Sequence, residues 1–207
     1  DKQDDRLCTL AFAACELQHY LRTLTGKQDD WHIADSRPRP VDPTIRLVTQ
    51  PDSKGLDPEG YTLRHSGTEG NWTLTVTGGG RVGTLYGVYV LLHRLGVRWY
   101  APGDANETVP AIDLTAPPAI DCAEAPAFKL RGFHAWEDRG DEEFLLWMAR
   151  NRLNYWCVEQ GNKPLVHKLG IQMIGGGHRI TEWYLGPTKA YPYDHSLFNR
   201  DDEKPAD

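Results

Sequence analysis

The sequence has few cysteines, and the four that it contains form no metal-binding pattern. Cys8 and Cys15 lie seven residues apart in a stretch with helical periodicity. They therefore share one face but are too far apart along the helix axis to form a disulfide, and we expect both to be buried as apolar residues. Neither Cys122 nor Cys157 has a cysteine or histidine at the spacing of a structural zinc site. We therefore predict no metal site.

The chain also lacks an excess of positive charge and a long apolar run. Its formal net charge is −6 at pH 7, so no basic stripe is available to replace the counterions of a nucleic-acid backbone. Its apolar runs are far shorter than the roughly 18 residues of a membrane-spanning helix. Its first residues, Asp-Lys-Gln-Asp-Asp, are not those of a signal peptide. We expect a soluble protein that neither binds nucleic acid nor spans a membrane.

Hydrophobic periodicity, by contrast, is clear in the first half of the chain. Apolar residues at spacings of three and four continue over Leu7–Leu24, and the pattern stops at Gly26. A second stripe of this kind runs over Leu85–Leu95 and stops at Gly96. A glycine directly after such a stripe is typical of a helix C-terminus. We expect two amphipathic helices, each with one buried face.

The remaining pattern in this half predicts short strands. Candidate strands lie at 31–34 and 45–49, and alternating apolar and polar residues at 61–66 and 72–76 predict an antiparallel hairpin with one buried face. Helices before and after such a hairpin favour the α+β class. We therefore predict a small mixed or antiparallel sheet with both helices on one of its faces.

Three glycines, Gly78, Gly80 and Gly83, satisfy the G-x-G-x-x-G pattern of a dinucleotide-binding loop. That function requires a parallel strand–helix–strand unit and an acidic residue about 20 residues further on. The nearest candidate, Asp104, lies beyond a Pro-Gly turn. The alternative is that the glycines form a tight turn and let the helix pack closely on the sheet. We favour the alternative and predict no cofactor.

The same region carries a resemblance to a known family. The segments are Gly83-Thr-Leu-Tyr-Gly-Val-Tyr89, Leu95-Gly-Val-Arg-Trp-Tyr-Ala-Pro-Gly-Asp104 and Val109-Pro110. They resemble the α/β domain that precedes the catalytic barrel in family 20 β-N-acetylhexosaminidases and family 67 α-glucuronidases. They are most similar to uncharacterised bacterial proteins that carry this domain ahead of a glycosidase-like barrel. The resemblance extends over about residues 7–178.

This resemblance implies two parts, an accessory domain over 1–118 and the start of a (β/α)8-like barrel over 119–207. A proline-rich crossing at 101–127 separates them. In the second part, patterns at 141–151 and 163–170 predict helices, and those at 155–158 and 171–174 predict strands. A complete barrel needs roughly 200 residues or more. We therefore expect the barrel to be incomplete in this chain, with the rest of the barrel as a partner.

Arg131 is the first candidate for a site residue. Its segment, Pro126-Ala-Phe-Lys-Leu-Arg-Gly-Phe-His134, resembles the first barrel strand of the family 20 enzymes, in which an arginine at this place binds sugar hydroxyls. A guanidinium offers planar paired donors to adjacent hydroxyls, and barrel strands present functional groups at their carboxyl ends. The alternative is an arginine that pairs with a carboxylate for structure.

Further candidates follow the other predicted strands. His178 ends a Gly-Gly-Gly-His run, which similar uncharacterised proteins also carry in part, and a histidine can bond a hydroxyl or carboxylate. Glu159 follows the strand at 155–158, and Trp136 or Trp183 would supply an apolar platform for a sugar ring. The alternatives are a capping or core histidine and a solvated loop glutamate.

These residues predict a carbohydrate-active protein of the glycoside hydrolase type that contributes an accessory domain and part of a sugar-binding cleft. Its substrate would be an oligosaccharide or polysaccharide, and we expect it in the bacterial periplasm or outside the cell. Glycoside hydrolysis normally needs two carboxylates, and the resemblance places them later in the barrel. Glu137, Asp138 and Glu159 are therefore only weak candidates. The alternative function is a non-catalytic carbohydrate-binding or interaction module.

Overall fold

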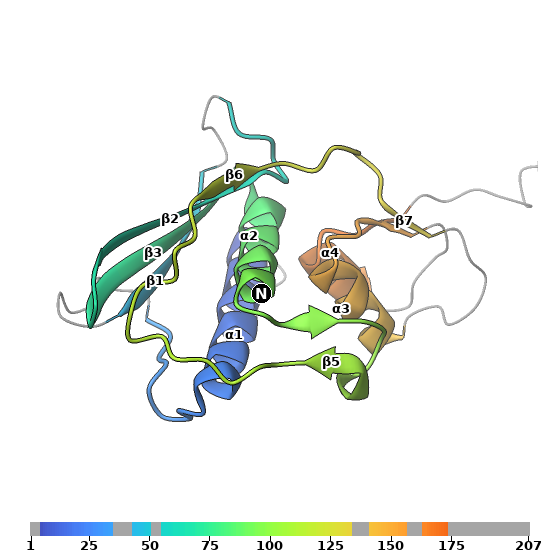
Figure 1. The fold of residues 1–207 in the computed structure, drawn as a ribbon. Helices are drawn as coiled ribbons and strands as arrows, with labels where there is room; N and C mark the ends of the chain where they lie inside the picture. The colour runs from blue at the N-terminus through green and yellow to red at the C-terminus, as the bar shows by residue number, and fades with distance from the viewer. Residues whose placement is uncertain (1–4, 35–42, 51–54, 134–140, 157–162, 174–207) are drawn as a thin grey trace, which may run out of the picture.

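The computed structural model describes residues 5–34, 43–50, 55–133, 141–156 and 163–173 (Figure 1). These residues form an α+β structure, as predicted. Four strands form the main sheet, with α1 and α2 together on one of its sides, and α3 and α4 lie beyond them (Figure 1). The elements of the first part are α1 (Asp5–Thr25), β1 (Thr44–Thr49), β2 (Tyr61–Thr68), β3 (Asn71–Gly78), α2 (Arg81–Arg94), β4 (Arg98–Trp99), a 3-10 turn (Asp104–Asn106), β5 (Glu107–Thr108) and β6 (Cys122–Glu124).

The main sheet is mixed and has the strand order β1-β3-β2-β6. The predicted hairpin is confirmed, because β2 and β3 pair antiparallel with Thr68 opposite Asn71. β1 joins β3 in parallel, and β6 joins β2 antiparallel. Trp72, Leu74 and Val76 alternate along β3 and are buried, so this sheet has one face against the helices.

One predicted strand is wrong. Residues 31–34 form no strand. The side chains of Gln18 and Arg22 on α1 both donate hydrogen bonds to the carbonyl of Trp31, at 2.7 and 3.0 Å. This backbone therefore bonds to the last turns of the helix instead of to a neighbouring strand.

α2 is buried on all sides, whereas its sequence predicts a single buried stripe. Ten consecutive residues, 83–92, are buried. The sheet and α1 both pack against the helix, α3 also contacts it, and residues of α3 and α4 belong to the same apolar cluster. A helix that is covered all round needs apolar or small residues at every position. One hydrophobic core therefore extends across the predicted boundary at 118.

α1 has a buried face formed by Ala13, Leu17, Leu21 and Leu24. Cys15 lies on the opposite side and is exposed, and Cys8 is half-buried. The expectation that both are buried is therefore wrong, because position 15 does not fall on the stripe that packs against α2.

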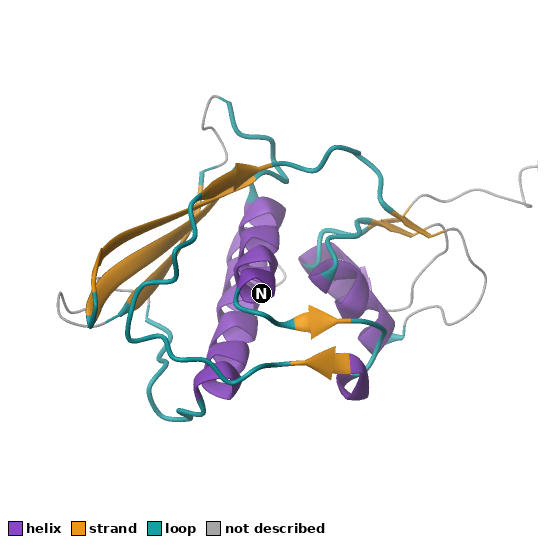
Figure 2. Cartoon of the chain, in the orientation of Figure 1, coloured by secondary structure: helices purple, strands orange, loops and turns teal. Residues whose placement is uncertain are grey.

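The second part has the order strand, helix, strand, helix, strand. Its elements are β7 (Gly132–Phe133), α3 (Glu142–Arg150), β8 (Tyr155–Trp156), α4 (Lys163–Lys168) and β9 (Gln172–Met173). The three strands pair in parallel in the order β7-β8-β9, separately from the main sheet and from the β4-β5 pair (Figure 2). The predicted helices and strands of this part are thus present, and the described residues form no closed barrel.

The burial of α2 gives a first prediction. Leu92 is 0% exposed, so Leu92→Ala should lower the free energy of unfolding by about 2–5 kcal/mol through lost burial and the cavity that remains. Urea denaturation measures this change. Leu130→Ala is a control, because that side chain is 51% exposed, and it should change the free energy by less than about 0.5 kcal/mol. Equal losses in both variants would contradict a core position for Leu92.

Candidate functional site

The carboxyl ends of three strands mark the candidate site. β7, β8 and β9 are parallel neighbours, so their carboxyl ends, at Phe133, Trp156 and Met173, lie at one edge. In sequence, the predicted residues Trp136, Glu159 and His178 each follow one of these ends within five residues. These three and Trp183 lie outside the described residues.

Aromatic side chains gather beside this edge. The rings of Phe133 and Trp147 are stacked, with centroids 5.9 Å apart, and Phe144 packs edge-on against Trp156 at 5.1 Å. Phe133 is 39% exposed, whereas Trp156 is buried. Within the part of the chain that the structure describes, the indole nitrogen of Trp156 has no hydrogen-bond partner. The sequence analysis missed this cluster, whose only signal was the apolar face of the helix at 141–151.

Arg131 is paired with a carboxylate. Its Nη2 donates to Glu59 Oε2 at 2.8 Å, and the two side chains are only 16% and 19% exposed. Its Nε donates to the carbonyl of Arg152 at 2.8 Å, and its Nη1 donates to the carbonyl of Phe128. All three guanidinium nitrogens therefore have protein partners. This is the structural arrangement that was the alternative to sugar binding.

The position of Arg131 also corrects an expectation. The sequence predicts this residue at the carboxyl end of the first barrel strand, but β7 begins at Gly132. Arg131 therefore lies at the amino end of β7. The reason is that its backbone N–H donates to the side chain of Asn154 at 2.9 Å, while strand pairing starts only with the next residue.

Glu59 and Asn154 complete this arrangement, and neither was predicted. Asn154 is fully buried, and its Nδ2 donates to Glu59 Oε1 and to the carbonyl of Lys129, at 2.8 and 2.7 Å. Glu59 thus accepts hydrogen bonds with both carboxylate oxygens. A carboxylate in this environment is stabilised by its charged and amide donors. Nothing local in the sequence signals the contact between Glu59 and Arg131, which lie 72 positions apart.

The glycine loop is covered by the protein itself. The N–H groups of Gly79 and Gly83 donate to the carbonyls of Gly60 and Pro58, at 2.9 and 3.2 Å. A Cβ atom at Gly78, Gly79 or Gly83 would overlap backbone atoms. β4, which follows α2, pairs with β5 and not with β3, so the parallel unit of a dinucleotide site does not form here. The glycines serve close packing.

A second buried ion pair connects α1 with α3. Arg150 donates to Glu16 at 3.1 Å and lies 3.8 Å from Glu107, and all three side chains are at most 16% exposed. Tyr20 donates to Glu107 at 2.7 Å, and burial raises the pKa of this phenol well above its usual value. Burial acts to lower the pKa of Arg150, but Glu16, Tyr20 and Tyr89 act together in the opposite direction and the pKa is raised. Arg150 therefore stays charged and holds both carboxylates.

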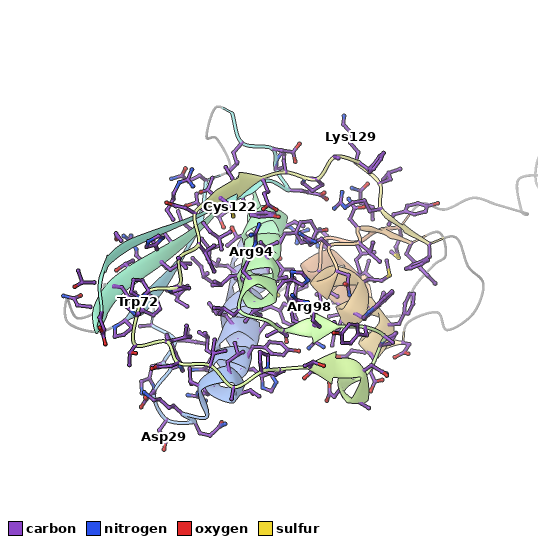
Figure 3. The ribbon with its side chains drawn as sticks, viewed as in Figure 1. Asp29, Trp72, Arg94, Arg98, Cys122 and Lys129 are labelled. Atoms are coloured by element: carbon purple, nitrogen blue, oxygen red, sulfur yellow. The ribbon has the colours of Figure 1, made fainter. Side chains whose placement is uncertain are left out.

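Two surface hollows lie among the described residues. One of about 420 Å³ lies beside the end of α2, and its lining includes Arg94 of that helix, Arg98 of β4 and Arg152 after α3. The other, of about 660 Å³, includes Trp31, Asp29, Asp30 and Asp113; Figure 3 shows Asp29 at the lower margin of the molecule. The described residues contain no group of three or more histidine, cysteine or acidic side chains that could hold a metal ion. None of their helices is long and apolar enough to cross a membrane.

The pairing of Arg131 gives a second prediction. Arg131→Ala should lower the free energy of unfolding by roughly 2–4 kcal/mol, because it leaves Glu59 without its charged partner in a largely buried position. Denaturant unfolding measures the change, and Glu59→Gln in a double-mutant cycle isolates the pair. Arg64→Ala is the control, since Arg64 and its partner Asp121 are 57% and 56% exposed, and it should cost less than about 1 kcal/mol. Unchanged stability in Arg131→Ala with loss of sugar binding would instead support a role as a sugar ligand.

A third prediction concerns the glycine loop. Calorimetric titration of the chain with NAD or FAD should show no saturable binding, because the N–H groups of Gly79 and Gly83 already have backbone acceptors and the loop packs against Pro58 and Gly60. A one-to-one site with a micromolar dissociation constant would contradict this assignment.

Comparison with known proteins gives no assignment for this geometry. No family model matches the chain, and no curated protein sequence matches it. These comparisons therefore neither support nor oppose the family resemblance of the sequence.

Proposed function

We propose that this chain is the N-terminal part of a carbohydrate-active protein of the glycoside hydrolase type. In this proposal, the α+β unit is an accessory domain, and β7 to β9 with α3 and α4 are the opening units of a (β/α)8-like barrel. The observation that carries the proposal is the parallel order β7-β8-β9 with a helix after each of the first two strands. Consecutive strands of such a barrel are neighbours in this way.

The proposed sugar cleft lies at the carboxyl edge of these strands. Barrel enzymes place their functional groups at this edge, and His178, Glu159 and Trp136 each follow one of its strands in sequence. Trp183 would add a second aromatic platform. Exposed Phe133 at the end of β7 already provides an apolar surface there, and apolar ring faces with a few polar groups suit the two faces of a sugar.

In this proposal Arg131 has a structural role and does not bind the sugar. Its guanidinium holds the start of β7 through Glu59, so it supports the cleft from the amino end of the strand. The catalytic carboxylates of a hydrolase are not assigned to this chain, and they would come from the rest of the barrel. A protein that degrades such polymers would act in the periplasm or outside the cell.

The second candidate is a non-catalytic carbohydrate-binding module. The hollow beside Trp31 favours it, because an indole ring and the carboxylates of Asp29, Asp30 and Asp113 line the same space. Carboxylates accept hydrogen bonds from sugar hydroxyls, and an indole can pack on a sugar ring.

Binding of the 207-residue chain to an array of oligosaccharides and polysaccharides tests both candidates, and this is the fourth prediction. His178→Ala and Trp183→Ala should each weaken binding of the selected glycan about tenfold or more, which corresponds to one lost hydrogen bond or stacking contact. Their melting temperatures should stay close to that of the unmodified chain.

The variant Asp29→Asn/Asp30→Asn separates the two candidates. It should leave binding unchanged if the cleft at the strand edge is used, and it should abolish binding if the hollow beside Trp31 is used. Absence of binding to every glycan, for the unmodified chain and for a longer chain that completes the barrel, would contradict both.

A further inference from the structure

The hollow at the end of α2 is positively charged in a chain whose net charge is negative. Its volume is about 420 Å³. Arg94 and Arg98 lie near each other on the side of the molecule seen in Figure 3. The lining residues are Val90, His93, Arg94, Arg98, Glu124 and Arg152. Three arginines and one glutamate thus line this hollow, although the chain as a whole carries a formal charge of −6.

Two of these arginines are held in place by neighbours. Arg98 Nη1 donates to the carbonyls of His93 and Val97, at 2.6 and 2.8 Å, and so caps the end of α2. Arg94 Nη2 donates to Glu124 at 3.0 Å, and the second oxygen of this carboxylate accepts from Tyr61 at 2.8 Å. Glu124 therefore shares its charge between two donors.

Arg152 has no such carboxylate partner. Among the described residues it forms no ion pair, and its Nη1 makes a long contact of 3.4 Å with the hydroxyl of Tyr61. Its charge acts on His93, whose pKa is lowered first by burial and then by Arg98, Arg152 and Arg94. The histidine is therefore neutral at pH 7 and can donate one ring N–H.

The backbone of Arg152 is the second unusual feature. It has a φ of +60°, and among the described residues it is the one non-glycine residue with a positive φ. The N–H of Arg152 donates to Ala149, and that of Leu153 donates to Met148. These two bonds end α3 in the left-handed cap at which glycine is the usual residue.

The other helices show what this position normally holds. Gly96 after α2 and Gly170 after α4 make the same pair of hydrogen bonds, with φ values of +102° and +73°. Gly26 follows α1 with a φ of +69°. Among the described helices, α3 alone has an arginine at the glycine position, at a cost in backbone energy. The cap itself does not require this side chain, since glycine would form it more readily.

We propose that this hollow is a binding site for a small oxyanion, such as a phosphate or carboxylate group, which Arg94, Arg98 and Arg152 hold together. Guanidinium groups offer paired N–H donors that match the oxygens of these anions. The anion would supply the charged partner that Arg152 lacks among the described residues, where its one side-chain acceptor is the Tyr61 hydroxyl. The bound oxyanion is either a free anion or an acidic group on a sugar. This site is separate from the sugar cleft proposed above.

The test is a calorimetric titration of the 207-residue chain with inorganic phosphate, at constant ionic strength set with sodium chloride. We expect saturable one-to-one binding that Arg152→Gly weakens about tenfold or more. This variant keeps the cap and removes the positive-φ cost, so its resistance to urea should equal or exceed that of the unmodified chain. Arg94→Gln should also weaken binding, whereas Arg64→Gln, an exposed arginine that does not line the hollow, should not.

A parallel titration with glucose 6-phosphate distinguishes the two sources. Tighter binding of the sugar phosphate, lost in Arg152→Gly, assigns the site to an acidic sugar, and tighter binding of inorganic phosphate assigns it to a free anion. Absence of saturable binding of both probes, or equal binding to the Arg152→Gly variant, would overturn the proposal. The result of these anion titrations does not change the expected outcome of the glycan array. Failure of the anion site and failure of the sugar cleft are therefore distinguishable.

Discussion

The carboxylate of Glu59 is the contact on which the arrangement of the two parts depends. It accepts hydrogen bonds from Arg131 and from buried Asn154, which fixes the start of β7 and the start of β8. The residues on either side of it, Pro58 and Gly60, accept hydrogen bonds from the glycine loop at the start of α2. One short turn therefore fixes the central helix and the parallel strands relative to each other. Removing one partner would leave a charged group largely buried, which is costly.

Much of the fold could be predicted because its signals are local. The hairpin, α1 and α3 follow from alternation or from spacings of three and four, and Gly26 and Gly96 correctly marked helix ends. The strand predicted at 31–34 was wrong because the side chains that bond its backbone belong to α1, outside the segment itself. The complete burial of α2 also had no local signal, since it depends on helices that come more than 45 residues later in the chain.

The candidate site was less predictable for the same reason. The partner of Arg131 lies 72 residues away in sequence, and its place before β7 depends on Asn154. Arg152 carried no signal, because a positive φ is visible in the sequence only when glycine occupies the position. The glycine motif was interpreted as a tight turn for close packing, and backbone carbonyls do fill the space beside Gly79 and Gly83. His178, Glu159, Trp136 and Trp183 lie outside the described residues, so their roles stay predictions.

The two buried ion pairs lie where the second part of the chain meets the α+β unit. Glu59–Arg131 lies at the amino end of β7, and Glu16–Arg150 joins α1 to the last turn of α3. Both therefore act on the side of the second part that faces the α+β unit, and both hold charges that are expensive to leave unpaired. The carboxyl ends of the strands lie at the other end of β7 and β8, away from Arg131 and Asn154. In (β/α)8 barrels the amino ends of the strands serve stability and the carboxyl ends serve chemistry, and the proposed function assigns the carboxyl ends here the same use. Because the first strand is fixed from its amino end, residues at the opposite edge can change without loss of the contacts that hold the two parts together.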